Sequence, residues 1–392
     1  MGGHTARRDS FERRFQAATL LVTALLLELG TCSLASSSWI AWPSQSTQTG
    51  ASKWGCDITS GEWVGGRNLP LYTGFNCPYV RSSQNCQKNG RQDMWFQKLK
   101  WRPHTCRTRR MTPKLLRNQL RDKLVLVFGD SVAKNFATSV MCVLHSSSPN
   151  LSEPLRFENR GSVVAHGMQI PRYNIRVASV TSNFLTNATD LPLSSSSPVG
   201  GYRVNLDQLQ DDILNLLPSA DLVVFQATNW WWSRSNKFFI GDTELTTIST
   251  TEAYEIGLQT LRFFVERAQQ RAFKGTAVLL GASPTHYDVP LQGVAGGSCQ
   301  VNQKLTWLEA QEVRQGDSNT ERFREVERRV LLESPIQYLD VGPMSDWRPD
   351  GHIQRWMDPG GASPSTRDDC RHWCEGGVTD AWLEMLYNTL LH

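Results

Sequence analysis

From about residue 115 onward, short apolar runs alternate with segments in which apolar residues recur at helical spacing. The runs at residues 124–128, 173–180, 221–227, 277–281 and 336–341 predict strands. The segments at residues 131–144, 206–217, 251–272, 321–332 and 379–391 predict helices. Residues 185–201 and 287–305 are predicted to be long loops. This alternation is typical of an α/β fold in which a mostly parallel sheet lies between helices on both of its faces.

The apolar run at residues 123–128 leads directly into the turn Gly129-Asp130-Ser131, which a predicted helix follows. A serine in this position stands at the carboxyl end of a strand and the amino end of a helix, where open α/β sheets bind ligands. The helix amides and dipole favour negative charge there, as an oxyanion requires. Because glycine, aspartate and serine are also common turn residues, an ordinary turn is the alternative interpretation.

A second candidate motif lies near the C-terminus, where Asp369 and His372 are three residues apart. A serine nucleophile needs a histidine base, and the base needs a carboxylate that fixes its tautomer. Three residues apart in a turn, the two side chains can face the same side. The two motifs together predict a Ser131–His372–Asp369 triad, although Asp350 and His352 form a competing acid–histidine pair.

The N-terminal residues carry targeting information. Four arginines between residues 7 and 14 precede an apolar segment at 17–35. This pattern predicts a cytosolic tail at 1–16 and a signal-anchor helix at 17–35, with the remainder translocated. A cleaved signal peptide ending near Ala35 is the alternative. Residues 36–52, rich in Ser, Thr, Gln and Gly, predict a flexible stem.

Charge and cysteine usage limit the classes of function. With 41 basic and 37 acidic residues the charge is nearly balanced, which gives no indication of nucleic-acid binding. Eight cysteines follow the apolar segment, a number typical of four disulfides in an oxidising compartment. Zinc is the alternative, but no cysteine or histidine cluster has the usual ligand spacing, so no metal is expected. Asn150 and Asn187 begin sequons for N-glycosylation, and the 14 tryptophans weakly favour a glycan ligand.

Residues 53–120 are predicted to form a cysteine-rich subdomain that precedes a catalytic domain at 121–392. The first part of this subdomain holds four cysteines and is rich in Gly, Pro, Asn, Trp and Tyr, with no clear helix. A loop-rich segment of this kind buries little core, so disulfides to itself and to the main domain are expected to hold it together.

Several short blocks occur in a fixed order along the chain. They are Gly61-Glu62-Trp63-Val64, Pro70-Leu71-Tyr72, Cys77-Pro78, Asn85-Cys86, Asn89-Gly90-Arg91-Gln92-Asp93, Trp101-Arg102-Pro103, Gly129-Asp130-Ser131, Gly297-Ser298-Cys299, Asp350-Gly351-His352, Asp369-Cys370-Arg371-His372-Trp373-Cys374 and Leu386-Tyr387-Asn388-Thr389-Leu390. In this set the chain resembles the trichome-birefringence-like family of plant polysaccharide O-acetyltransferases, which belongs to the PC-esterase group related to the GDSL/SGNH hydrolases. The resemblance implies a three-layer SGNH-hydrolase-like domain in a single-pass type II protein of the Golgi membrane.

The resemblance also implies a mechanism. Ser131 matches the family's nucleophile, Asp369 its triad acid and His372 its base, in a double displacement through an acetyl-serine intermediate. The partners would be an acetyl donor and a cell-wall polysaccharide such as xylan, with no organic cofactor. An acetylesterase of the same fold and a non-catalytic glycan-binding protein are the alternatives.

Further site residues follow from the same resemblance. Asn229 stands where the family has a histidine and is predicted to form the oxyanion hole with the Ser131 amide, with a role as a loop cap as the alternative. The candidates for substrate binding are Asp130, Lys134, Asn135, Trp230, Trp231 and His286. Core packing is the alternative for the tryptophans, and a structural role is the alternative for His286. Asp350 and His352 are expected to be a structural or acceptor-side pair.

The resemblance finally implies a disulfide pairing, which the eight cysteines alone leave open. The implied pairs are Cys56–Cys106, Cys77–Cys142, Cys86–Cys374 and Cys299–Cys370.

Overall fold

The computed structural model of the chain describes most residues from Asp57 onward. The described residues are 57–67, 70–155, 158–159, 162–163, 166–192, 200–233, 235–287, 298–355 and 368–391. They all belong to one unit, Gln48–His392. The predicted tail, signal anchor and stem lie outside the described residues. Within the described ranges no helix is long and apolar enough to cross a membrane.

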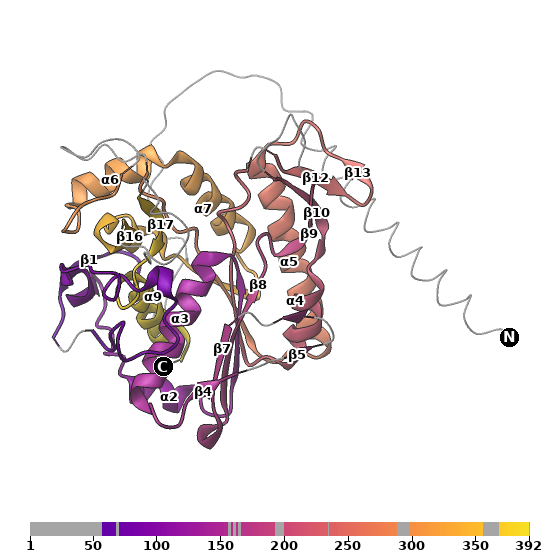
Figure 1. Ribbon diagram of the computed structural model, residues 1–392. Helices are drawn as coiled ribbons and strands as arrows, with labels where there is room; N and C mark the ends of the chain where they lie inside the picture. Colours follow the sequence, from indigo (N-terminus) through magenta and orange to yellow (C-terminus); the bar gives the residue numbers. More distant parts are fainter. Residues whose placement is uncertain are drawn as a thin grey trace. The chain divides into compact units, whose positions relative to one another are not determined.

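A seven-stranded sheet with the strand order β15-β14-β11-β3-β8-β7-β4 forms the centre of the fold (Figure 1). Its strands are β3 (Leu124–Gly129), β4 (Glu153–Pro154), β7 (His166–Ile170), β8 (Ile175–Thr181), β11 (Leu222–Gln226), β14 (Thr276–Leu280) and β15 (Ile336–Leu339). The five strands from β15 to β8 are parallel, whereas β7 and β4 each run antiparallel to their neighbour. The mostly parallel sheet predicted from the sequence is therefore confirmed.

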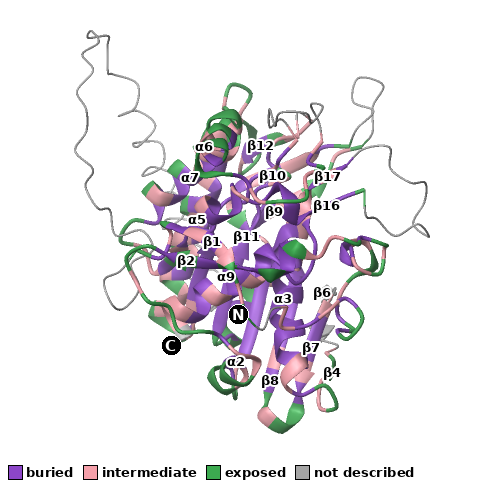
Figure 2. Cartoon of the chain, turned by 90° about the vertical axis from the view of Figure 1, so that its left-hand side faces the viewer, coloured by how far each residue is buried: buried purple, intermediate pink, exposed green. Residues whose placement is uncertain are grey.

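Helices cover both faces of this sheet (Figure 1). On one face lie α3 (Ser131–Ser147) and α9 (Val378–Leu386), and on the other lie α4 (Asp211–Leu216), α5 (Thr250–Arg271) and α7 (Ser318–Val330). Successive side chains of a strand point to opposite faces, so Val125 and Val127 join the core around α3, while Leu124 and Leu126 join the core around α5. Figure 2 shows α3 and the strands behind it as mainly buried. The predicted three-layer fold is confirmed.

The segment before the main sheet is held to it covalently. Here β1 (Gly61–Gly65) and β2 (Leu99–Pro103) form a two-stranded antiparallel sheet, and α2 (Pro113–Gln119) leads into β3. Disulfides join Cys77 to Cys142 in α3 and Cys86 to Cys374. The loop-rich, disulfide-clamped segment is thus present as expected. Cys56 lies outside the described residues, so the pair Cys56–Cys106 stays a prediction.

One predicted helix is partly wrong. Residues 206–209 belong to β10 (Tyr202–Leu209), which lies in a second sheet of order β13-β12-β10-β9 with β9 (Thr186–Asp190), β12 (Lys237–Ile240) and β13 (Thr243–Glu244). The helical part of this region is α4, which a 3-10 turn over Leu217–Ser219 follows. Leu206, Leu209 and Ile213 recur at a helical spacing, but residues 203–205 pair with β12 on one side and β9 on the other, and after a register shift Leu209 pairs with Thr186 of β9. Non-local pairing therefore overrides the local pattern.

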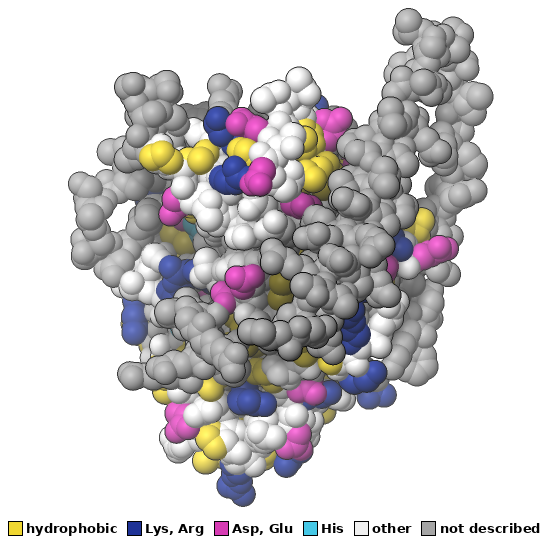
Figure 3. All heavy atoms as spheres, turned by 90° about the vertical axis from the view of Figure 1, so that its right-hand side faces the viewer, with side chains coloured by type: hydrophobic (Ala, Val, Ile, Leu, Met, Phe, Trp, Pro, Cys, Tyr) yellow, Lys and Arg dark blue, Asp and Glu magenta, His cyan; other side chains and the backbone are white. Residues whose placement is uncertain are grey.

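Other elements complete the unit. The sequence did not predict α6 (Trp307–Gly316), α8 (Gly342–Ser345) or the small antiparallel sheet of β16 (His352–Gln354) and β17 (Asp369–Trp373). The last predicted helix begins as α9 and continues as a π-helix over Tyr387–Leu391. On the face shown in Figure 3, the coloured Lys and Arg side chains are interspersed with Asp and Glu, consistent with the nearly balanced charge of the chain.

Candidate active site

The turn between β3 and α3 brings Ser131 to the carboxyl edge of the sheet. In the sheet β3 lies between β8, which follows it in the chain, and β11, which comes later. The turn after β3 therefore lies where the strand order reverses. Gly129 is required because a Cβ there would lie 1.7 Å from the carbonyl oxygen of Gln226. Asp130 caps the helix by accepting the N–H of Val132 at 2.8 Å. Ser131 is consequently the first residue of α3 and remains partly exposed.

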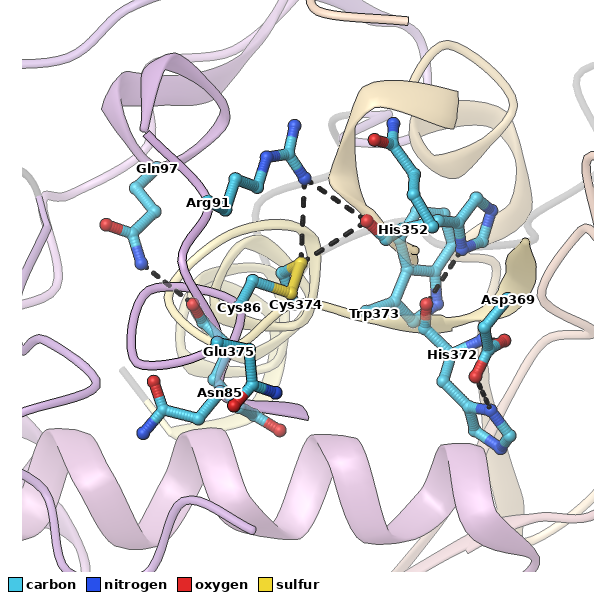
Figure 4. Close-up of a disulfide and its surroundings, with 12 residues drawn as sticks. Asn85, Cys86, Arg91, Gln97, His352, Asp369, His372, Trp373, Cys374 and Glu375 are labelled. Atoms are coloured by element: carbon cyan, nitrogen blue, oxygen red, sulfur yellow. Dashed lines mark hydrogen bonds and ion pairs between the residues drawn. A yellow bond between two sulfur atoms is a disulfide. The ribbon is translucent and has the colours of Figure 1, made fainter. Parts of the chain in front are cut away.

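The second motif meets this serine. His372 in β17 places its Nε2 atom 2.6 Å from Ser131 Oγ. Its Nδ1 atom lies 2.7 Å from Asp369 Oδ2. The three side chains therefore form one hydrogen-bonded series, in the geometry that a serine nucleophile, a base and an orienting carboxylate require. Figure 4 shows the histidine and the aspartate of this series, seen beside α3.

The Asp369 carboxylate is held in its ionised form. Burial by itself would raise the pKa of this carboxyl, but the hydrogen bonds from the His372 ring and from the backbone amides of His372 and Arg371 outweigh it and lower the pKa to about 2. These two amides donate to Oδ1, at 3.0 and 3.1 Å. Because Oδ1 is occupied by the backbone, Oδ2 is left for the ring. The carboxylate can thus fix the ring with its proton on Nδ1 and its free lone pair toward Ser131.

Two disulfides flank the strand that carries His372. Cys370 pairs with Cys299, and Cys374 pairs with Cys86 (Figure 4). Three of the four disulfides implied by the resemblance are therefore present. The pairs Cys299–Cys370 and Cys86–Cys374 tie both ends of β17 to distant parts of the chain, which limits movement of the histidine.

Four of the candidate substrate-binding residues are buried, so that assignment is corrected for them. Asp130, Asn135 and His286 are each 0% exposed, and Trp231 is 1% exposed. Trp231 packs among core aromatics, with its ring 5.2 Å from that of Tyr254. None of the four side chains is accessible to a polysaccharide. Asp130 and Asn135 instead hydrogen-bond to the backbone of segments around the triad, and Trp231 belongs to the hydrophobic core.

Asp130 illustrates this supporting role. Its Oδ2 atom accepts the backbone amides of Thr228 and Asn229 and the side-chain Nδ2 of Asn229, at 3.2, 3.0 and 2.9 Å. One aspartate therefore joins the serine turn to the loop that follows β11. This places Asn229, the predicted oxyanion donor, at the same helix end as Ser131.

Two candidates remain accessible. Trp230 is 40% exposed and meets Tyr202 edge-on at 5.6 Å. Lys134 is partly exposed, and burial together with the nearby Arg81 lowers the pKa of its amine. Lys134 lies three residues after Ser131 in α3, and Trp230 directly follows Asn229.

The competing pair does not form. Asp350 accepts two hydrogen bonds from the fully buried Arg348 guanidinium, at 2.7 and 3.1 Å. The His352 ring instead lies 2.6 Å from His286 Nδ1 and 3.0 Å from the carbonyl oxygen of His372. Asp350 and His352 are therefore structural residues, one of the two options left open by the sequence.

A buried acidic cluster beneath α3 was not predicted. Glu375 accepts from Asn135 at 2.9 Å, and the single proton of the Tyr72 hydroxyl faces Asp380 Oδ1 at 2.9 Å, with Glu375 Oε2 farther away at 3.3 Å. Burial raises the pKa of Glu375 well above its ordinary value and that of Asp380 to about 7. The only sequence signal was the position of Glu375 directly after Cys374.

Among the residues that the structure describes, no group of three or more His, Cys, Asp and Glu side chains could hold a metal ion.

The fold and the site define a class: a three-layer α/β domain with serine, histidine and aspartate aligned at the carboxyl edge of a parallel sheet. Residues 109–389 match PC-Esterase, a GDSL/SGNH-like acyl-esterase family found in Pmr5 and Cas1p, and residues 54–107 match the PMR5 N-terminal domain. The chain belongs to the PC-esterase family.

Its relatives agree with the resemblance found in the sequence. Trichome birefringence-like 4 of Arabidopsis thaliana is 28% identical over 86% of this chain and 75% of its own length. Trichome birefringence-like 41 is 28% identical over 86% of this chain and 91% of its own length. Xyloglucan O-acetyltransferase 2 from the same plant is 25% identical, with coverage of 84% and 81%. The chain spans only 56% of protein trichome birefringence, which is 27% identical.

Proposed function

We propose that this protein is a polysaccharide O-acetyltransferase that carries the acetyl group on Ser131. The observation behind the proposal is the pair of contacts Ser131 Oγ–His372 Nε2 at 2.6 Å and His372 Nδ1–Asp369 Oδ2 at 2.7 Å. The relative named xyloglucan O-acetyltransferase 2 supports acetyl transfer to a polysaccharide as the reaction class. The candidate acceptors are xyloglucan and xylan, the example that the family resemblance implies.

In the first half-reaction, Ser131 Oγ attacks the acetyl carbonyl carbon of the donor while His372 Nε2 takes the hydroxyl proton. The oxyanion that forms on the carbonyl then collapses, and the donor's leaving group departs with the proton from His372. Asp369 remains ionised throughout and stabilises the imidazolium. The products are acetyl-Ser131 and the free donor group.

In the second half-reaction, a sugar hydroxyl takes the place of the donor. His372 removes its proton as the oxygen attacks the acetyl ester, and Ser131 leaves with that proton. If water replaced the sugar hydroxyl, the same steps would release acetate, which is the acetylesterase alternative favoured by the family's name. If the bound acceptor excludes water from the acetyl-serine, transfer to the sugar is favoured over hydrolysis.

The oxyanion is proposed to bind the Ser131 amide and Asn229 Nδ2. The amide belongs to the first turn of α3, whose N–H groups have no acceptor within the helix. Asn229 is fixed beside it because one of its N–H groups donates to Asp130 at 2.9 Å, and the oxyanion would take the other. Trp230, with its exposed ring, and Lys134 remain the proposed contacts to the sugar chain.

We further infer that the protein acts in the secretory lumen, as a type II Golgi membrane protein or, alternatively, as a secreted one. The disulfides of the described region support an oxidising compartment. Asn150, exposed in the turn after α3, and Asn187, partly buried in β9, are the proposed glycosylation sites.

Incubation of the protein with an activated acetyl donor and candidate glycans tests this proposal. The expected product is acetylated glycan, which the Ser131→Ala variant does not form. Release of acetate without glycan acetylation would identify an esterase. Glycan binding that is equal in both proteins, with no turnover, would identify the non-catalytic alternative.

A further inference from the structure

The peptide bond between His372 and Trp373 is hydrogen-bonded on both of its sides. Its carbonyl oxygen lies 3.0 Å from His352 Nδ1 (Figure 4), and its N–H donates to Asn135 Oδ1 at 3.3 Å. The same Asn135 side chain donates from Nδ2 to the carbonyl oxygen of Trp373 at 3.0 Å. Two fully buried side chains thus fix the orientation of the backbone immediately after the triad histidine.

Asn135 links this peptide to the nucleophile. It lies four residues after Ser131 in α3, so the two side chains share one face of the helix. Its second Nδ2 hydrogen bond, to Glu375 at 2.9 Å, uses the remaining donor and fixes the amide orientation. The backbone of β17 is therefore held directly against the helix that carries Ser131.

His352 holds the opposite side. Its ring stacks on Trp373 at 3.9 Å between centroids, and its Nε2 atom lies 2.6 Å from His286 Nδ1. A carbonyl oxygen can only accept, so the bond to His372 requires the proton on His352 Nδ1. Nε2 then accepts the proton of His286 Nδ1. We assign this arrangement because the contact at the other end of the pair, His286 Nε2 to the Asp346 carbonyl, is longer at 3.2 Å.

We propose that Asn135 and His352 are positioning residues for His372, which act by fixing the peptide after it so that Nε2 stays aligned with Ser131 Oγ. Neither side chain touches the reacting atoms. The inference rests on the proposed acyl transfer and adds residues that set the geometry of its base. Because a misplacement of reacting groups by about 1 Å can cost about 100-fold in rate, removal of either residue is expected to lower the rate by about 10- to 100-fold.

A matched pair of substitutions at position 352 tests the proposal. His352→Phe keeps an aromatic ring on Trp373 but cannot donate to the carbonyl of His372. His352→Asn gives up the stacked ring but keeps an N–H donor close to the Nδ1 position. Both variants lose the bond to His286 and differ in the donor and in the stacked ring, which predict opposite orders of activity.

The kinetic readout is kcat and KM for hydrolysis of 4-nitrophenyl acetate by the full chain, with Ser131→Ala as the blank. We expect His352→Phe to lower kcat at least tenfold with KM within about twofold, and His352→Asn to stay within about threefold of the wild type. A merely structural role predicts the opposite order, because phenylalanine preserves the buried packing better. Equal kcat values in the two variants, or a higher kcat for His352→Phe, would overturn the proposal.

A second readout does not depend on turnover. The proton on His372 Nδ1, shared with Asp369, gives a strongly deshielded NMR signal when the ring is aligned. The signal is expected in the wild type and in His352→Asn but not in His352→Phe. If this pattern holds while the wild type turns over no faster than Ser131→Ala, the proposed function fails and the positioning role stands. If the signal is the same in all three proteins, the positioning role fails.

Asn135→Ala provides an independent arm. It removes both links to Trp373, and kcat is expected to fall at least tenfold with little change in KM. The control is Tyr254→Phe, which removes a buried 2.7 Å hydrogen bond to Glu327 on the opposite face of the sheet. It should lower the melting temperature and leave kcat unchanged. A kcat for folded Asn135→Ala within twofold of the wild type would contradict the proposal. If Asn135→Ala does not fold, the two His352 variants provide the test.

Discussion

Replacement of Asp369 by asparagine is predicted to leave the site assembled with its base in the wrong tautomer. In the native site, Oδ1 accepts the backbone N–H groups of His372 and Arg371, and Oδ2 faces the ring. An asparagine keeps its carbonyl oxygen on the two backbone donors. Its NH₂ group then faces Nδ1 of His372, which must accept. The ring proton moves to Nε2, where it points at Ser131 and blocks proton transfer.

The size of the effect follows from the two backbone hydrogen bonds. Rotating the amide to restore the reactive tautomer would turn the NH₂ group toward both N–H donors. Each donor left unpaired costs about 1–3 kcal/mol, so the reactive form lies roughly 2–6 kcal/mol higher. This corresponds to a loss in kcat of about 30-fold to about 3 × 10⁴-fold, a range that includes the loss of about 10⁴-fold known for a triad with the same substitution.

Steady-state hydrolysis of an activated acetyl ester measures this loss. The matched control is Asp368→Asn, the same change at the adjacent position, where the carboxylate bonds to Ser298, Gln300 and Arg355 rather than to His372. The control should retain kcat within a few fold. Retention of more than a third of the wild-type kcat by Asp369→Asn would refute the reasoning, as would an equal loss in both variants.

Three further predictions concern the scaffold. Gly129→Ala should unfold or inactivate the protein, since the new Cβ would lie 1.7 Å from a backbone oxygen; a wild-type melting curve and kcat would contradict this. Serine at both Cys299 and Cys370 opens a disulfide that spans 71 residues and should cost about 4 kcal/mol of unfolding free energy, measured with urea; a change below about 1 kcal/mol would argue against it. Burial raises the pKa of Asp380 to about 7 in the fold from 3.8. This carboxyl therefore destabilises the protein increasingly as pH rises from about 4 to 7. Asp380→Asn should raise the melting temperature at pH 8 but not at pH 4, and no gain at pH 8 would count against the assignment.

The sheet and the triad could be predicted because local patterns carry them. Continuous apolar runs such as residues 124–128 are strands buried on both faces, and this signal needs no knowledge of the partner strands. Ser131, Asp369 and His372 stand in compact motifs whose spacing limits what they can do. The structure brings these three side chains together across more than 230 residues of chain, with Ser131 and His372 separated by 241 positions.

The sequence could not show which side chains around the motifs are accessible to substrate and which are buried. Asn135 and His286 were assigned to substrate from the family resemblance, yet both are completely buried. Which face of a helix or loop turns inward depends on partners that are distant in sequence, such as Trp373 for Asn135. The strand at residues 202–209 was missed for the same reason, since its helical leucine spacing is overridden by pairing with β9 and β12.

The most direct test of the account is intact-protein mass spectrometry after exposure of the purified protein to an activated acetyl donor, with Ser131→Ala beside it. The account predicts one added acetyl group, located on Ser131 by peptide mapping and absent from the variant. It also predicts that the adduct disappears when an acceptor glycan is added, with acetylated glycan as the product. An adduct on another residue, or turnover that survives in Ser131→Ala, would contradict the central claim that Ser131 carries the acetyl group.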